Sequence, residues 1–130
     1  MPEELVKAAT SFGGGVALSK NLCGCLSDAA MVVGLKHGTT EPTGTAPRPA
    51  YARTKAVMDR FRDRFGTIEC GDLTAKWAND FAHPDRAYSC GELLRFTLER
   101  VMEVTARSEE SPEWQEAWWD DYLNRRDKVE

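Results

Sequence analysis

The sequence predicts an all-α fold, a compact bundle of five or six helices with a buried central helix. Apolar residues recur at helical spacing in several segments, and helix-start and helix-stop residues punctuate the chain. No segment alternates apolar and polar residues as strands do. The 130 residues suffice for one domain with its own core. We therefore expect a helical domain over residues 1–110 and a C-terminal aromatic helix over residues 111–130.

The N-terminal part of the chain predicts two helices around a glycine-rich turn. A proline and two glutamates suit a helix start, so the first helix is expected over residues 2–12. Gly13, Gly14 and Gly15 end it, because glycine permits backbone angles that break a helix. The next expected helix, residues 22–37, has Asn21 as its N-cap and Gly38 as its stop. Apolar and small residues almost encircle it, which is typical of a central buried helix.

The middle of the chain predicts three more helices. Residues 50–65 carry apolar side chains at a 3.6-residue period and are followed by Gly66. A short helix is expected after Cys70. The capping box Ser89-Cys90-Gly91-Glu92 predicts the start of a long helix that reaches about Arg107. The preceding His83-Pro84-Asp85 predicts a turn.

The last segment concentrates aromatic residues, with Ser111-Pro112 as its expected helix start. Its aromatic side chains recur at helical spacing, and a face of this kind must cover something apolar. It could pack on its own domain or form a homodimer. The residues concerned are Trp114, Trp118, Trp119 and Tyr122.

Composition argues against several classes of function. The formal net charge is −4 and the chain has no basic run, so we expect no nucleic-acid or anionic-membrane partner. No apolar run approaches the ~18 residues of a membrane span. The beginning of the sequence lacks the basic and apolar stretches of a signal peptide, so a cytoplasmic location is expected.

Three of the four cysteines are expected in the first turn of a helix. Cys23 follows the expected cap of its helix, Cys70 begins the short helix, and Cys90 follows Ser89. Unpaired N–H groups and the helix dipole favour a thiolate at such positions, and the thiolate is the nucleophile and metal ligand. We therefore expect Cys23, Cys70 and Cys90 to converge, with at least one lowered thiol pKa. Cys70 and Cys90 are the preferred disulfide pair.

The fourth cysteine, Cys25, is expected to point away from Cys23. Each helical residue turns by about 100°, so two residues separate the side chains by about 200°. The pair could act together only if the helix begins at or after Cys25.

Several motifs carry a resemblance to a known family. They are Phe12-Gly13-Gly14-Gly15, Cys23-Gly24, Gly34-Leu35-Lys36-His37-Gly38, and Cys70 followed by Cys90 at the head of a long helix. On these residues the chain resembles, over about residues 3–106, the redox-active family named for its pattern C_GCAxxG_C_C. The resemblance implies an all-helical fold and a cysteine-based redox or metal role.

The chain departs from the family pattern at two points. The family begins with a cysteine upstream of the triple glycine, and this chain has no counterpart to it. The second cysteine of the pattern is matched by Cys23 when the alignment runs through Gly34, and by Cys25 when it follows the named motif. We favour Cys23, with Cys25 as an extra thiol.

A metal site is one use for these thiolates. Cys23, Cys70 and Cys90 would suit an iron–sulfur cluster or zinc if Cys25, Asp28, His37 or His83 supplied a fourth ligand. The long spacings lack the CxxC pairs typical of such sites. The triple glycine could instead let a ligand approach the backbone, or simply form a tight interhelical turn. Asp28 is the sole acidic residue of its apolar helix, and it is either functional or a solvated or salt-bridged carboxylate.

Taken together, these residues predict a cysteine-based redox or electron-transfer protein that uses thiol–disulfide chemistry or a bound metal or iron–sulfur cluster. The alternative is a non-catalytic helical metal-binding or interaction domain whose cysteines stabilise the core. An enzyme whose thiolate attacks a substrate is a third reading, although no Cys–His pairing is evident. The identity of the electron donor or acceptor does not follow from the sequence.

Overall fold

The computed structural model describes residues 2–40 and 48–106. This part of the chain contains five α-helices and two 3-10 helices, and its β pairing is an isolated bridge between Leu22 and Glu69. In chain order the elements are α1 (Glu3–Ala8), η1 (Thr10–Phe12), α2 (Gly24–His37), α3 (Arg48–Phe65), α4 (Cys70–Leu73), η2 (Ala75–Trp77) and α5 (Pro84–Thr105). The predicted all-α class is confirmed for these residues.

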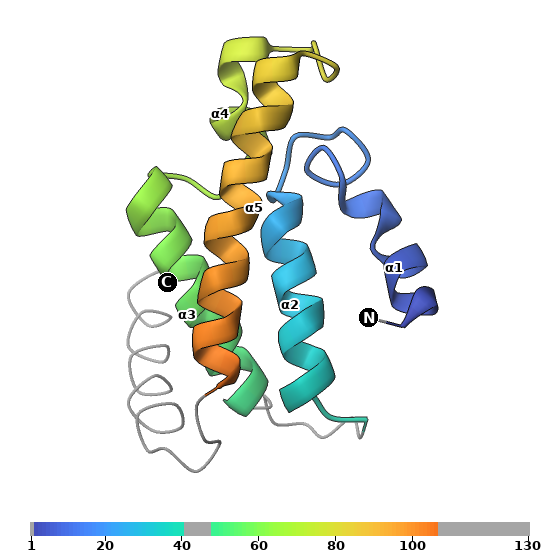
Figure 1. Cartoon of the computed structure of the whole chain (residues 1–130), viewed down its shortest axis with the longest axis vertical. Coiled ribbons are helices and arrows are strands. Elements are labelled where there is room, and N and C mark those ends of the chain that lie inside the picture. The colour runs from blue at the N-terminus through green and yellow to red at the C-terminus, as the bar shows by residue number, and fades with distance from the viewer. Residues whose placement is uncertain (1, 41–47, 107–130) are drawn as a thin grey trace, which may run out of the picture.

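Three long helices form the body of the molecule (Figure 1). Helices α2, α3 and α5 each contact the other two, while α1 lies beside α2 and α4 lies near the start of α5. Their shared core contains mainly apolar side chains with little or no exposure: Leu26, Val33, Val57, Phe61, Val101 and Val104. The rings of Phe61, Phe65 and Phe96 extend this core between α3 and α5, with centroids 4.8 to 6.5 Å apart.

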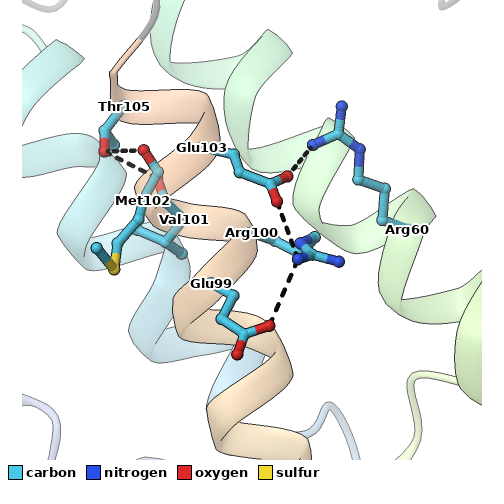
Figure 2. A network of polar contacts seen from close by, with 7 residues as sticks. All are labelled: Arg60, Glu99, Arg100, Val101, Met102, Glu103 and Thr105. Carbon is cyan, nitrogen blue, oxygen red and sulfur yellow. Dashed lines mark hydrogen bonds and ion pairs between the residues drawn. The ribbon is translucent and has the colours of Figure 1, made fainter.

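Polar contacts hold α3 against α5 at the end opposite the cysteines. Arg53 is fully buried, and its guanidinium donates to the backbone oxygens of Val104 (3.1 Å) and Pro49 (3.0 Å). Nearer the surface, Glu103 accepts from both Arg60 (3.2 Å) and Arg100 (2.9 Å), as Figure 2 shows. The buried arginine is well satisfied by backbone acceptors, whereas the exposed pairs contribute little to stability.

The predicted helix ends are more accurate than the predicted starts. α2 stops at His37 before Gly38, and α3 stops at Phe65 before Gly66, whose φ of +83° suits glycine. The first helix, expected over residues 2–12, is instead divided into α1 and η1. Its last turn tightens into a 3-10 helix, a common way for a helix to end.

The start of α5 corrects a prediction. The helix begins at Pro84, not at the capping box around Ser89, and the residues expected to form a turn are its N-terminus. His83 is the N-cap, because its Nδ1 accepts a hydrogen bond from the Asp85 N–H at 3.1 Å. Proline at the first helical position is compatible with a helix start, since the N–H that it lacks has no helical partner there.

The prediction of a buried central helix is not confirmed. The buried residues of α2 form one stripe (Leu26, Ala29, Val33 and His37), while Ala30 and Leu35 are exposed. Small apolar residues therefore occur on the outer face of α2 without being covered by another described element.

The described helices include none that is both long enough and apolar enough to cross a membrane. The predicted aromatic helix, with Trp114, Trp118, Trp119 and Tyr122, lies outside the described residues. Packing of that segment on the domain and formation of a homodimer through it both stay predictions.

Candidate functional site

All four cysteines line one cavity of about 340 Å³ at the N-terminal end of α2. Side chains and backbone from four parts of the chain meet there. They are the glycine turn, the first turn of α2, the start of α4 and the second turn of α5. The lining residues include Gly13, Gly14, Gly15, Cys23, Cys25, Asp28, Cys70, Arg86 and Cys90.

A short pairing of backbones brings Cys23 next to Cys70. The Cys23 N–H donates to the Ile68 oxygen at 2.9 Å, and the Cys70 N–H donates to the Asn21 oxygen at 2.6 Å. This pairing is why α2 starts later than predicted: Asn21 and Leu22 are extended against residues 68–70 instead of capping a helix. Cys23 therefore becomes the N-cap of α2, with φ −55° and ψ 128°.

Two glycines permit the close approach of backbones around the cysteines. A Cβ added to Gly15, whose φ is +69°, would lie 2.6 Å from the Cys70 Cβ and 2.6 Å from the Asn21 nitrogen. A Cβ on Gly24, between Cys23 and Cys25, would lie 2.8 Å from the Phe12 oxygen. All three distances are shorter than real side-chain contacts, so a larger residue would push the cysteine-bearing segments apart.

The glycine turn is longer than the sequence indicated. Five consecutive residues have positive φ, and only the first two are glycines; Val16, Ala17 and Leu18 follow at 67°, 51° and 63°. Left-handed backbone costs a non-glycine residue about 1 kcal/mol or more, so tertiary contacts must hold it. Backbone bonds within the loop do so, among them Lys20 N–H to Gly14 O and Asn21 N–H to Gly15 O, both at 2.9 Å. The apolar sequence after Gly15 carries no signal for this conformation.

Cys23 and Cys25 were expected to point apart, yet both line this cavity, and the Cys25 thiol is the largest influence on the pKa of Cys23. Cys23 is the N-cap residue of α2, so its backbone is not yet helical. The side-chain hydrogen bond from Cys25 lowers the pKa of Cys23 from 9.0 to about 7, burial opposes this, and the N–H groups of Cys25 and Leu26 assist it. The same hydrogen bond and burial raise the pKa of Cys25.

This pair has the properties that thiol–disulfide exchange needs. The first thiol to react must be a thiolate near neutral pH, and a second thiol must be close enough to attack the intermediate. Cys23 supplies the first property and Cys25 the second. All four cysteines are free thiols in this structure.

Cys70 and Cys90 occupy the same cavity in different surroundings. Cys70 is buried at the first position of α4, with its sulfur 4.0 Å from the Thr74 Oγ1. Cys90 does not lie in a first helical turn as predicted, because α5 begins six residues earlier, at Pro84. It therefore has no free N–H groups to stabilise a thiolate, and burial raises its pKa, against an opposing effect of Arg86.

Arg86 is a cavity residue that the sequence analysis missed. It lies four residues before Cys90 on α5, a spacing that places two side chains on the same face of a helix. Its guanidinium lies 4.7 Å from the Phe81 ring centroid and donates to the Phe81 oxygen at 3.3 Å. The helical pattern could have revealed it only if the start of α5 had been placed correctly.

Asp28 also lines the cavity, one turn after Cys25 on α2. Burial raises its pKa, and its charge in turn raises the pKa of both Cys23 and Cys25. Its Oδ1 is buried and has no hydrogen-bond partner within the described part of the chain. A functional role for Asp28 stays a prediction.

The two histidines considered as fourth metal ligands do not line this cavity. His37 is buried at the far end of α2, and His83 caps α5. Within residues 2–40 and 48–106, no three His, Cys, Asp or Glu side chains are grouped closely enough to hold one metal ion. A metal or iron–sulfur site at these cysteines stays a prediction.

Comparison with protein families gives a match over most of the chain. The family described as "Putative redox-active protein (C_GCAxxG_C_C)" matches residues 1–104, most of the chain. No curated protein matches the chain, and no solved structure does.

Proposed function

The chain belongs to the C_GCAxxG_C_C family, and on that premise we propose that it transfers electrons by thiol–disulfide exchange at Cys23 and Cys25. The observation that carries the proposal is the placement of both thiols in one cavity at the start of α2, with Cys23 as the N-cap residue. The lowered pKa of Cys23 and the raised pKa of Cys25 support an attacking role for Cys23 and a resolving role for Cys25.

The reaction has two exchange steps. The Cys23 thiolate attacks one sulfur of a substrate disulfide, so that a Cys23–substrate disulfide forms and the first substrate thiolate leaves and takes up a proton. Cys25 then loses its proton and attacks the Cys23 sulfur. The intramolecular disulfide forms and the second substrate thiolate leaves. The substrate gains two electrons, the cysteine pair loses two, and the reverse sequence would oxidise a dithiol.

Serine variants separate these two steps. With an excess of oxidised glutathione, the Cys25→Ser variant should accumulate a mixed disulfide at Cys23, because no resolving thiol remains. The Cys23→Ser variant should react slowly, while Cys90→Ser, a change in the same cavity, should leave the formation of a Cys23–Cys25 disulfide intact. Alkylation of the remaining thiols and peptide mass spectrometry would identify each product.

Two results would contradict the proposal. If no thiol of the native wild-type chain reacts until denaturant is added, the cysteines are structural, as in a non-catalytic helical domain. If protein purified without oxygen contains stoichiometric iron or zinc, or shows a visible charge-transfer band, the bound-metal alternative replaces thiol exchange. The preferred Cys70–Cys90 disulfide stays a prediction, and the same mapping experiment tests it.

A further inference from the structure

A second, larger cavity of about 550 Å³ lies among α1, α2 and α5. Its walls are almost entirely apolar, and Val6, Ala29, Val32, Leu94, Leu98 and Val101 are among the side chains that line it. Several are well exposed, including Val6 (57%), Leu98 (49%) and Leu94 (41%). Cavities of this size, apolar with a few polar groups, are typical of sites for small organic molecules.

This apolar cavity borders the cysteine cavity. Cys25, Asp28 and Leu94 line both of them. A molecule that fills the apolar cavity therefore lies against Cys25, and Cys23 lines the neighbouring cavity.

The polar groups of the apolar cavity restrict the charge of its occupant. The hydroxyls of Thr97 and Thr10 donate to backbone oxygens of their own helical segments, at 2.8 and 3.4 Å. Asp28 is the one ionisable carboxylate in the lining, and its buried Oδ1 is unpartnered among the described residues. An anionic group here would meet a carboxylate, and a charged group of either sign would lose its hydration against the apolar wall, so an uncharged molecule fits best.

We propose that the apolar cavity binds the organic part of an uncharged, apolar, low-molecular-weight disulfide or thiol, and holds its sulfur at Cys25 and Cys23. The proposal rests on the proposed function, because it names the substrate class of the same exchange reaction. The bonds formed and broken are those given above: Cys23 attacks the substrate disulfide, Cys25 resolves the intermediate, and two substrate thiols leave.

Methanethiosulfonates of graded size and charge test this substrate class. Each forms a disulfide between its alkylthio group and a thiolate, and releases methanesulfinate. The rate at Cys23 and Cys25, divided by the rate with N-acetylcysteine, should rise at least about tenfold from the methyl to the benzyl reagent, because a larger apolar group is buried. The anionic sulfonatoethyl reagent should show no such gain. Equal normalised rates for all three reagents would overturn the proposal.

A matched pair of variants locates the effect in the cavity. Leu98→Glu places a charge in the apolar wall without touching a thiol, and should reduce the benzyl preference roughly tenfold. Leu35→Glu is the control, since Leu35 is similarly exposed (53%) but lies outside both cavities. Circular dichroism would verify that both variants are folded. An equal loss in both variants, or no loss in Leu98→Glu, would contradict the assignment.

A binding measurement separates this proposal from the proposed function. Uncharged 1-aminoanthracene should bind the reduced wild-type chain with enhanced fluorescence, and Leu98→Glu should weaken that binding while Leu35→Glu does not. If the probe binds but the thiols do not exchange, the proposed function is refuted, and the cavity is a site for apolar ligands without thiol chemistry. If the thiols exchange but the probe does not bind and larger reagents react no faster, the proposed function stands and the apolar substrate class is refuted.

Discussion

Cys23 combines two properties that rarely occur together, burial and a lowered pKa. Only 6% of its surface is exposed, and burial alone would raise the pKa of a thiol. The hydrogen bond from Cys25 and the open first turn of α2 outweigh that penalty. Asp28 acts in the opposite direction, since its charge raises the pKa of both cysteines. The pKa of Cys23 therefore depends on two neighbours with opposite effects.

Removal of the Cys25 thiol should raise the pKa of Cys23. In the wild-type chain, the rate of Cys23 alkylation by iodoacetamide should rise with pH around a midpoint near 7. In Cys25→Ala the main stabilising hydrogen bond is lost, so the midpoint should move toward the ordinary value of 9.0, and alkylation at pH 7 should slow roughly tenfold. An unchanged midpoint would show that Cys25 does not stabilise the thiolate.

Removal of the Asp28 charge should have the opposite effect. Asp28→Asn eliminates the negative charge that raises the pKa of Cys23, so the alkylation midpoint should fall below that of the wild-type chain. Asp63→Asn is the control, because it removes the same charge from an exposed residue of α3 that lines neither cavity. A higher midpoint in Asp28→Asn, or equal shifts in both variants, would contradict this electrostatic role.

At the scale of elements, the site depends on how closely the glycine turn approaches its neighbours. Gly15 touches the start of α4 and Gly24 touches the end of η1, and in both cases the absence of a side chain makes the contact possible. The left-handed residues Val16, Ala17 and Leu18 continue the turn at an energetic cost. The backbone pairing of residues 20–23 with 68–71 then fixes Cys23 beside Cys70.

Alanine substitutions should distinguish a glycine that permits this close approach from a glycine in the interior of an ordinary helix. Gly15→Ala should destabilise the fold by about 2–4 kcal/mol, because φ is +69° and the new Cβ would overlap the Cys70 Cβ and the Asn21 nitrogen. Gly34→Ala should stabilise it by roughly 0.5–1 kcal/mol, since Gly34 lies within α2 and an added Cβ meets nothing within 4 Å. Urea unfolding under reducing conditions measures both changes. A tolerated Gly15→Ala would show that the turn does not pack as described.

At the scale of the whole molecule, the three-helix body supports a site at one end. The apolar core and the buried Arg53 join α2, α3 and α5, and the cysteine cavity lies where α2 begins. Both cavities border this core, since Cys23 and Leu93 line the cysteine cavity, and Ala29 and Val101 line the apolar one.

The thiolate links the stability of the whole fold to pH. The pKa of Cys23 in the folded chain, about 7, lies below its ordinary value of 9.0, so the unfolded chain retains the proton between these values. The stability that Cys23 contributes is complete above about pH 9 and is lost as the pH falls through about 7. The free energy of unfolding of the reduced wild-type chain, relative to Cys23→Ala, should therefore increase by on the order of 2 kcal/mol between about pH 6 and pH 9. A difference that is constant with pH would show that the folded chain does not hold a thiolate.

The sequence by itself determined the features that depend on neighbouring residues. Helical periodicity predicted the all-α class, and the glycines after His37 and Phe65 predicted the ends of α2 and α3. Stop signals act over one turn of backbone, so a local reading is sufficient for them. The motifs around Gly13, Cys23, Cys70 and Cys90 indicated the family and drew attention to the thiols.

The tertiary structure alone decided where those thiols lie. Residues 21–22 pair with a segment far along the chain, and this long-range contact moves the start of α2 and makes Cys23 its N-cap. The start of α5 at Pro84 moves Cys90 out of the first helical turn and places Arg86 in the cavity. The junction between the thiol cavity and the apolar cavity arises from the packing of α1, α2 and α5. Local propensity acts within a few residues, whereas these positions result from contacts between segments distant in the sequence.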